Sequence, residues 1–224
     1  MKATHPSNLK NYLNLVRKDL LMEWRQKHTL FGVLLYVGST VFVIHMMSGS
    51  PDSKIWNALF WITQLFVAVT TVAKSFLQEH PNRFRYYYTL TNPATFLLAK
   101  ITYSILLMLL MTLVSLMLFA LLLGFQAEQA VVFIIIALSG GVSLSVVFSF
   151  LSAIAARAQQ NAAVMAILGF PIVTPILMML SNLSLKALTP VYQTGSLQLA
   201  ALLLLLDFMV VVLGIILFPF LWQE

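Results

Sequence analysis

The chain has 224 residues, of which 60% are hydrophobic and 9% are charged, and its mean hydropathy is +0.92. Soluble domains contain about 25% charged residues, so this composition excludes a water-soluble fold and predicts that lipid is the solvent for most of the chain. The net charge is +6, but most basic residues lie beside apolar runs, which indicates membrane topology rather than nucleic-acid binding.

The N-terminal region, residues 1–28, is predicted to be cytoplasmic and to contain an amphipathic helix between Ser7 and Lys27. Its apolar residues recur at helical spacing, at Leu9, Tyr12, Leu13, Val16, Leu20 and Trp24. Such a helix lies flat on the inner membrane surface, and its candidate headgroup contacts are Arg17, Lys18, Trp24 and Arg25. A charged leader that only fixes the topology is the alternative. The first long apolar run begins at Thr29, so we expect no cleavable signal sequence.

Residues 29–224 are predicted to form one all-α transmembrane domain of six helices. The apolar runs are long enough for spanning helices, and they lack the alternation of transmembrane strands. The expected spans are about 29–47, 55–76, 95–124, 130–156, 162–180 and 197–222. With the N-terminus in the cytoplasm, all Lys and Arg residues except Lys54 and Lys186 fall on or near the inner side. Both termini are therefore expected to be cytoplasmic.

The inner loop between the second and third spans, Gln78–Pro93, is polar, basic and rich in tyrosine, with the sequence QEHPNRFRYYYTLTNP. Tyrosine and arginine are enriched at protein interfaces, so a short helix here could dock into a groove on a cytoplasmic partner. The alternative is an ordinary inner loop whose tyrosines lie in the headgroup layer.

The fifth span contains Gly169, Pro171 and Pro175. Two prolines four residues apart interrupt the backbone hydrogen bonds, so the helix is expected to kink or to stop there. The semi-polar segment Ser181–Ser196 that follows would then fit a short re-entrant or interfacial helix on the outer face. A kink that the membrane helix simply tolerates is the alternative.

Few polar residues are expected inside the membrane. Asp207 lies near the middle of the last span and is a functional candidate, although it could instead be protonated or paired with a polar group of another helix. Gln64 and His45 are the other candidates, and His45 is near the outer end of its span. Small residues in the fourth span, from Ser139 to Ser149, are expected to pack against other helices.

No motif for catalysis is present. The sequence has no P-loop, no His-Glu-x-x-His and no Gly-x-Ser-x-Gly, and it contains no cysteine. We therefore expect neither an enzyme nor a metal site, but a membrane subunit that relies on another protein for energy.

Three stretches carry a resemblance to a known family. They are Leu15–Trp24 (LVRKDLLMEW), Leu90–Ile101 (LTNPATFLLAKI) and Gly140–Pro175, which begins GGVSLSVVFSF and ends LGFPIVTP. The order of parts resembles that of ABC-2-type export permeases, and these motifs are similar to those of the haem exporter protein B (CcmB) family.

The resemblance implies the permease subunit of a cytochrome c maturation system in the bacterial inner membrane. Two copies would pair with two cytoplasmic P-loop ATPase subunits, and the N-terminal helix would be an elbow helix. The complex would work with a haem-handling membrane protein and a periplasmic haem chaperone. Haem would be cargo rather than a bound cofactor, and ATP would act through the partner. The loop would be the coupling helix, with the candidate contacts Glu79, Arg83, Phe84, Arg85, Tyr86 and Tyr87.

Two other functions stay open at this point. The chain could be another ABC-2-type permease that exports a lipid, a drug or a peptide. It could also be a stand-alone secondary transporter that uses Asp207 as its proton or cation site.

Overall fold

The computed structural model describes residues 8–25, 27–49, 51–72, 92–157, 162–188 and 195–223, and all regular structure in these ranges is α-helical. The helices are α1 (Asn8–Arg25), α2 (Lys27–Ser48), α3 (Ser53–Thr71), α6 (Pro93–Leu123), α7 (Ala130–Arg157), α8 (Ala162–Leu188) and α9 (Ser196–Gln223). The all-α fold class is thereby confirmed for these residues.

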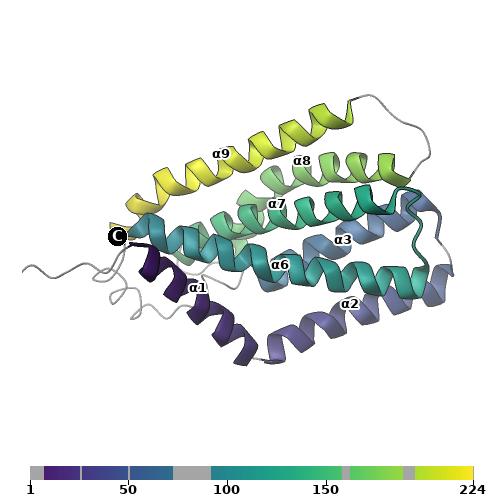
Figure 1. The fold of residues 1–224 in the computed structure, drawn as a ribbon, viewed down its shortest axis with the longest axis horizontal. Helices are drawn as coiled ribbons and strands as arrows, with labels where there is room; N and C mark the ends of the chain where they lie inside the picture. The colour runs from purple at the N-terminus through teal and green to yellow at the C-terminus, as the bar shows by residue number, and fades with distance from the viewer. Residues whose placement is uncertain are drawn as a thin grey trace, which may run out of the picture.

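Helices α2, α3 and α6 to α9 run side by side along the long axis of the molecule, and α1 lies at an angle across one end (Figure 1). We call this the α1 end. The starts of α6 and α8 and the final turns of α7 and α9 lie there too, whereas the start of α3 lies at the opposite end. Helix α7 is central, since it packs against α3, α6, α8 and α9.

Four helices of the described ranges are long and apolar enough to cross a membrane, namely α6, α7, α8 and α9. The described apolar part of α2, Phe31–Met47, is shorter than a full span. Helix α3 carries Asn57 and Gln64 within its 19 residues, so its apolar content is lower. The chain is thus a multi-pass membrane protein, while the count of six spans stays a prediction.

The boundaries of α6 follow local sequence signals. Pro93 occupies the start of the helix, where its missing N–H costs no hydrogen bond. Gly124, with a φ of 76°, follows the last residue and ends the helix in a conformation that favours glycine.

Helix α8 does not stop at its prolines. Pro171 and Pro175 both lie inside it, and it continues to Leu188, beyond the expected end at residue 180. The expectation of a separate short helix from residue 181 is therefore wrong. The extension is stable because Ser184 is fully buried against polar partners on α3, so its hydroxyl does not interrupt the packing.

A cluster of aromatic side chains fills the core near the opposite end. Trp56 stacks on Phe60 with a centroid distance of 5.8 Å, and the rings of Phe119 and Phe133 meet Trp56 edge-on at 5.4 and 5.3 Å. These four side chains are fully buried, so α3, α6 and α7 share one rigid aromatic contact.

Candidate functional site

One face of α8 is unusual for a helix in a membrane. Phe170, Thr174, Met178 and Asn182 follow one another at intervals of four residues and form a stripe on one side of the helix. Phe170 and Met178 are 75% and 65% exposed, and Asn182 is exposed as well. We call these four residues the α8 stripe.

The prolines add unpaired backbone groups near this stripe. Pro175 has no N–H, so the carbonyl of Pro171 has no donor from the following turn of the helix. The Thr174 hydroxyl donates a hydrogen bond of 2.6 Å to the carbonyl of Phe170. Lipid cannot satisfy free carbonyls or an exposed amide, so this face is suited to contact with protein or with water.

Helix α3 holds α8 in place through a buried polar network. The Asn57 amide donates to the Ser181 carbonyl at 3.0 Å, and Asn57 Oδ1 accepts from the Ser184 hydroxyl at 2.6 Å. Ser184 Oγ in turn accepts from Trp61 Nε1 at 2.8 Å. Asn57 and Ser184 are fully buried, and satisfied networks in a low-dielectric interior fix one arrangement of the helices.

The position of Trp61 depends on a glycine of α7. A Cβ added to Gly140 would lie 2.6 Å from Trp61 Cζ3, in contact with Cη2 of the same ring and 2.9 Å from Leu180 Cδ2. Glycine therefore allows the indole to lie directly on the α7 backbone. The expectation that the small residues of this span pack against other helices is confirmed here.

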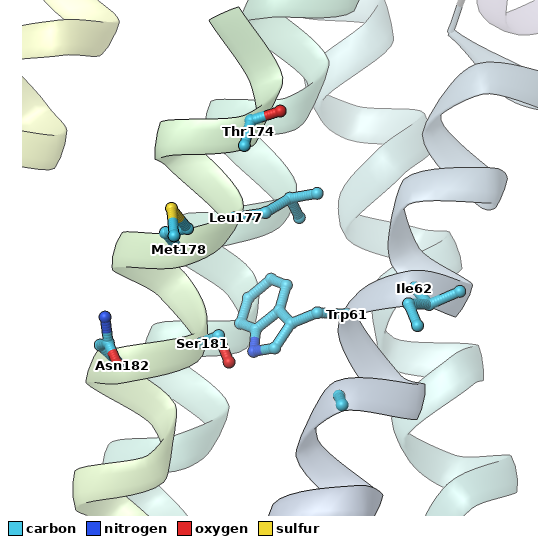
Figure 2. A pocket seen from close by; sticks show the side chains of 8 residues that line it. Trp61, Ile62, Thr174, Leu177, Met178, Ser181 and Asn182 are labelled. Atoms are coloured by element: carbon cyan, nitrogen blue, oxygen red, sulfur yellow. The ribbon is translucent and has the colours of Figure 1, made fainter. Parts of the chain in front are cut away.

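A groove runs between α3 and α8 beside the stripe (Figure 2). It has a volume of about 370 Å³. Its lining is mostly apolar, and the indole of Trp61 forms one wall while Thr174, Met178 and Asn182 lie along α8 (Figure 2).

A second cavity of about 530 Å³ lies at the opposite end and shares Asn182 with the groove. Its lining includes Asp52, Lys54 and Lys186. The α3–α8 face thus changes from apolar in the middle of the bundle to charged at its end.

Asp207 contacts α7. The Ser143 hydroxyl donates to Asp207 Oδ2 at 2.6 Å, while Asp207 Oδ1 is buried without a hydrogen-bond partner. Asp207 therefore joins α9 to α7 and lies away from the residues that line the α3–α8 groove.

The other two polar candidates lie in different surroundings. Gln64 is fully buried and accepts from the Thr112 hydroxyl at 3.2 Å, which confirms its expected burial. His45 is exposed near the end of α2. Among the residues described, no three His, Cys, Asp or Glu side chains gather as a metal ion would need.

The contact of α1 with α6 contains the residues that sequence reasoning missed. Asp19 Oδ2 lies 3.0 Å from Lys100 Nζ, and each side chain is only 4% exposed. Tyr103 donates to Glu23 Oε2 at 2.8 Å, and Tyr12 donates to Thr102 Oγ1 at 2.7 Å. The available signal was the spacing of Asp19 and Glu23, which lie one turn apart on one helix face.

The predicted contacts of α1 are partly outside this interface. Arg17 and Arg25 are exposed, and Lys18 lies 3.1 Å from Asp19 Oδ1. The side chain of Trp24 lies outside the described residues. Leu13 and Leu20 of the expected apolar stripe are exposed, whereas Leu15 and Val16 are buried against the bundle.

The predicted coupling segment is not part of the described ranges. Glu79, Arg83, Phe84, Arg85, Tyr86 and Tyr87 lie between Val72 and Asn92, outside the described residues. Its flanking helices, α3 and α6, are described, and α6 begins with Pro93.

The comparisons with known proteins identify a family. Residues 10–222 match the family described as CcmB protein, which covers nearly the whole chain. No curated protein and no solved structure matches the chain. The chain belongs to the CcmB protein family, whose members are membrane-embedded permease subunits of the haem exporter ABC system.

Proposed function

We propose that the chain is the non-catalytic permease subunit of an ABC transporter for cytochrome c maturation. In this role it couples ATP hydrolysis by a partner subunit to haem delivery, or to release of the haem-loaded periplasmic chaperone. The observation that carries the proposal is the family match over residues 10–222. Haem is then cargo handled with partner proteins, and ATP acts through the ATPase.

The proposed topology has six spans, made of α2, α3 and the four longer helices, with the α1 end in the cytoplasm of a bacterial inner membrane. The distribution of charge supports this orientation. Helix α1 carries Arg17 and Arg25 and contacts Lys100 through Asp19, whereas Lys54 is in the first turn of α3 and Lys186 in the last turn of α8. Helix α1 is then the elbow helix, with its exposed leucines and arginines in the inner interface.

Two copies of the chain would pair through the α3–α8 face. The support is chemical, because the α8 stripe combines exposed Phe170 and Met178 with Thr174 and Asn182 beside a groove. A second copy would cover the exposed amide and supply partners for the free carbonyls, which lipid cannot do.

The ATPase would bind at the α1 end through the segment before Pro93. This segment contains Glu79 and Arg83, and charged residues on a helix suit a groove on a soluble partner. A displacement of the segment would pass directly into α6.

A pull-down of the tagged chain in mild detergent, with mass spectrometry of the proteins that accompany it, tests the function. A P-loop ATPase together with a haem-handling membrane protein is the expected result. An ATPase alone would favour export of another substrate by an ABC-2-type permease. Recovery of no ATPase would refute the proposal and favour a secondary transporter that uses Asp207.

The coupling role of the segment is tested separately. Glu79→Ala and Arg83→Ala should uncouple ATP hydrolysis from cytochrome c maturation while the complex still reaches the membrane. Glu128→Ala is the matched control, since it removes an exposed charge between α6 and α7 at the opposite end. Normal maturation by both loop variants would contradict the coupling role.

A further inference from the structure

We propose that Asp19 and Lys100 form a rigid link that makes α1 and the first two turns of α6 move as one body. The inference rests on the proposed function, because the movement in question is the one that the ATPase would impose on the start of α6. Asp19 and Lys100 act in this role as positioning residues.

The first argument is the chemistry of the contact. Asp19 and Lys100 are 81 residues apart in the sequence, yet their charged atoms lie 3.0 Å apart with 4% of each side chain exposed. Both charged groups are removed from solvent, so separating them would cost the attraction of a close, buried pair, and the contact resists separation. Lys18, 3.1 Å from the other oxygen of Asp19, adds a second positive charge on α1 beside this contact. A pair of apolar residues would hold the helices with less directional constraint.

The second argument is that the ion pair does not act alone. The Tyr103–Glu23 and Tyr12–Thr102 hydrogen bonds also join α1 to α6, and they have lengths of 2.8 and 2.7 Å. Polar contacts at three points resist rotation of α1 about its own axis as well as its separation from α6.

The third argument is the crossing geometry. The three contacts use four consecutive residues of α6, Lys100 to Tyr103, but they spread over α1 from Tyr12 to Glu23. Twelve residues of helix cover ~16 Å, so α1 crosses α6 obliquely and is held near the middle and near the end of its length. Figure 1 shows α1 at an angle to α6, beside the start of α6.

The fourth argument is the place of the link along the chain. Lys100 lies two turns after Pro93, the first residue of α6, and α6 directly follows the predicted coupling segment. Helix α1 ends at Arg25 and α2 begins at Lys27. A displacement of the start of α6 would therefore reach α2 through α1, without passing along the whole of α6.

The chain has no cysteine, so two introduced cysteines can carry spin labels at known positions. Leu13→Cys on α1 and Leu98→Cys in the first two turns of α6 suit this purpose, because both leucines are exposed, at 56% and 38%. The distance between the labels is measured by electron paramagnetic resonance in the complex with its ATPase, without nucleotide and after trapping with ATP and vanadate.

For the unaltered pair, the distance between the two labels of one chain is expected to be narrow and the same in both states. In Lys100→Met the distance should already be broader at rest than in the unaltered protein and should broaden further on trapping, and cytochrome c maturation should be lost while ATP hydrolysis continues. The double variant Asp19→Lys with Lys100→Asp should restore the narrow distance and maturation. Glu128→Gln, at an exposed site between α6 and α7, is the matched control and should change neither.

Two results would overturn the inference while leaving the proposed function intact. One is a label distance that changes on trapping in the unaltered protein. The other is a Lys100→Met variant that keeps both a narrow distance and normal maturation. Absence of a bound ATPase from the unaltered protein would instead refute the proposed function. In that case, a narrow distance in the resting Lys100→Met protein would also overturn the link.

Discussion

The close approach of Trp61 to Gly140 predicts that one added methyl group destabilises the protein. In Gly140→Ala the new Cβ would lie 2.6 Å from Trp61 Cζ3 and 2.9 Å from Leu180 Cδ2. Both side chains are buried, so the ring can move only by disturbing its neighbours and the 2.8 Å hydrogen bond to Ser184. Overpacking and a weakened buried hydrogen bond together cost about 2–4 kcal/mol.

This cost is measured by thermal unfolding in mild detergent, followed by far-ultraviolet circular dichroism. For a chain of this size it corresponds to a fall in the unfolding midpoint of roughly 4–16 °C. Gly38→Ala on α2 is the matched control, since no atom lies within 4 Å of its added Cβ. That variant should be neutral or slightly stabilised, because alanine favours the helix.

A double-mutant cycle identifies the cause. Trp61→Phe removes the outer ring of the indole, so Gly140→Ala should cost little when it is introduced into that variant. The reasoning is refuted if Gly140→Ala unfolds like Gly38→Ala, or if it costs the same in both backgrounds.

Three further outcomes are expected. Asn57→Ala should lower the unfolding free energy by about 1–3 kcal/mol in the same assay, because it leaves Ser184 without its acceptor on α3. The exposed residue Asn182 is the control, and Asn182→Ala should change the unfolding free energy by no more than about 0.5 kcal/mol. Equal effects of the two substitutions would contradict the buried network. Gly141→Ala should destabilise the chain, since its Cβ would lie 2.7 Å from Thr112 Oγ1. Thr112→Ala should remove this clash but also the hydroxyl that donates to Gln64, so Gly141→Ala should cost less in that background than in the unaltered chain. Asp207→Asn should support normal cytochrome c maturation, because the amide oxygen still accepts from the α7 serine, and loss of maturation would argue for a proton site instead.

The apolar helices could be predicted because their signal is local. The apolar run of α6 is bounded by Pro93 and Gly124, which act on the backbone directly. The observed ends of α6 differ from the expected ends of the third span by two residues or fewer. The burial of Gln64 was also predictable, because a polar side chain inside an apolar span faces the interior of the bundle rather than lipid.

The orientation of α1 could not be predicted from its apolar pattern. The expected stripe included Leu13 and Leu20, which are exposed, while Asp19 is buried. In a membrane protein, exposed leucines can face lipid at no cost, so apolar residues do not by themselves select the packed face. The packed face is selected by Asp19 and its partner Lys100, a pairing between distant parts of the chain that no local pattern contains.

The length of α8 was mispredicted for a related reason. Asn182 and Ser184 made the segment after residue 180 resemble the end of a span. Ser184 is instead satisfied by Asn57 and Trp61 of α3, and this depends on the packing of two helices more than 120 residues apart in the sequence.

The two tryptophans of α3 differ in one respect that has a practical consequence. Trp56 is enclosed by aromatic rings, whereas Trp61 forms a wall of the α3–α8 groove (Figure 2). The wavelength of indole emission depends on the polarity around the ring, so Trp61 would respond to whatever fills the groove while Trp56 would give a constant signal. With Trp24 and Trp222 replaced by phenylalanine, the emission spectrum of the chain could therefore report, without any added label, whether water, lipid or another helix lies against this face.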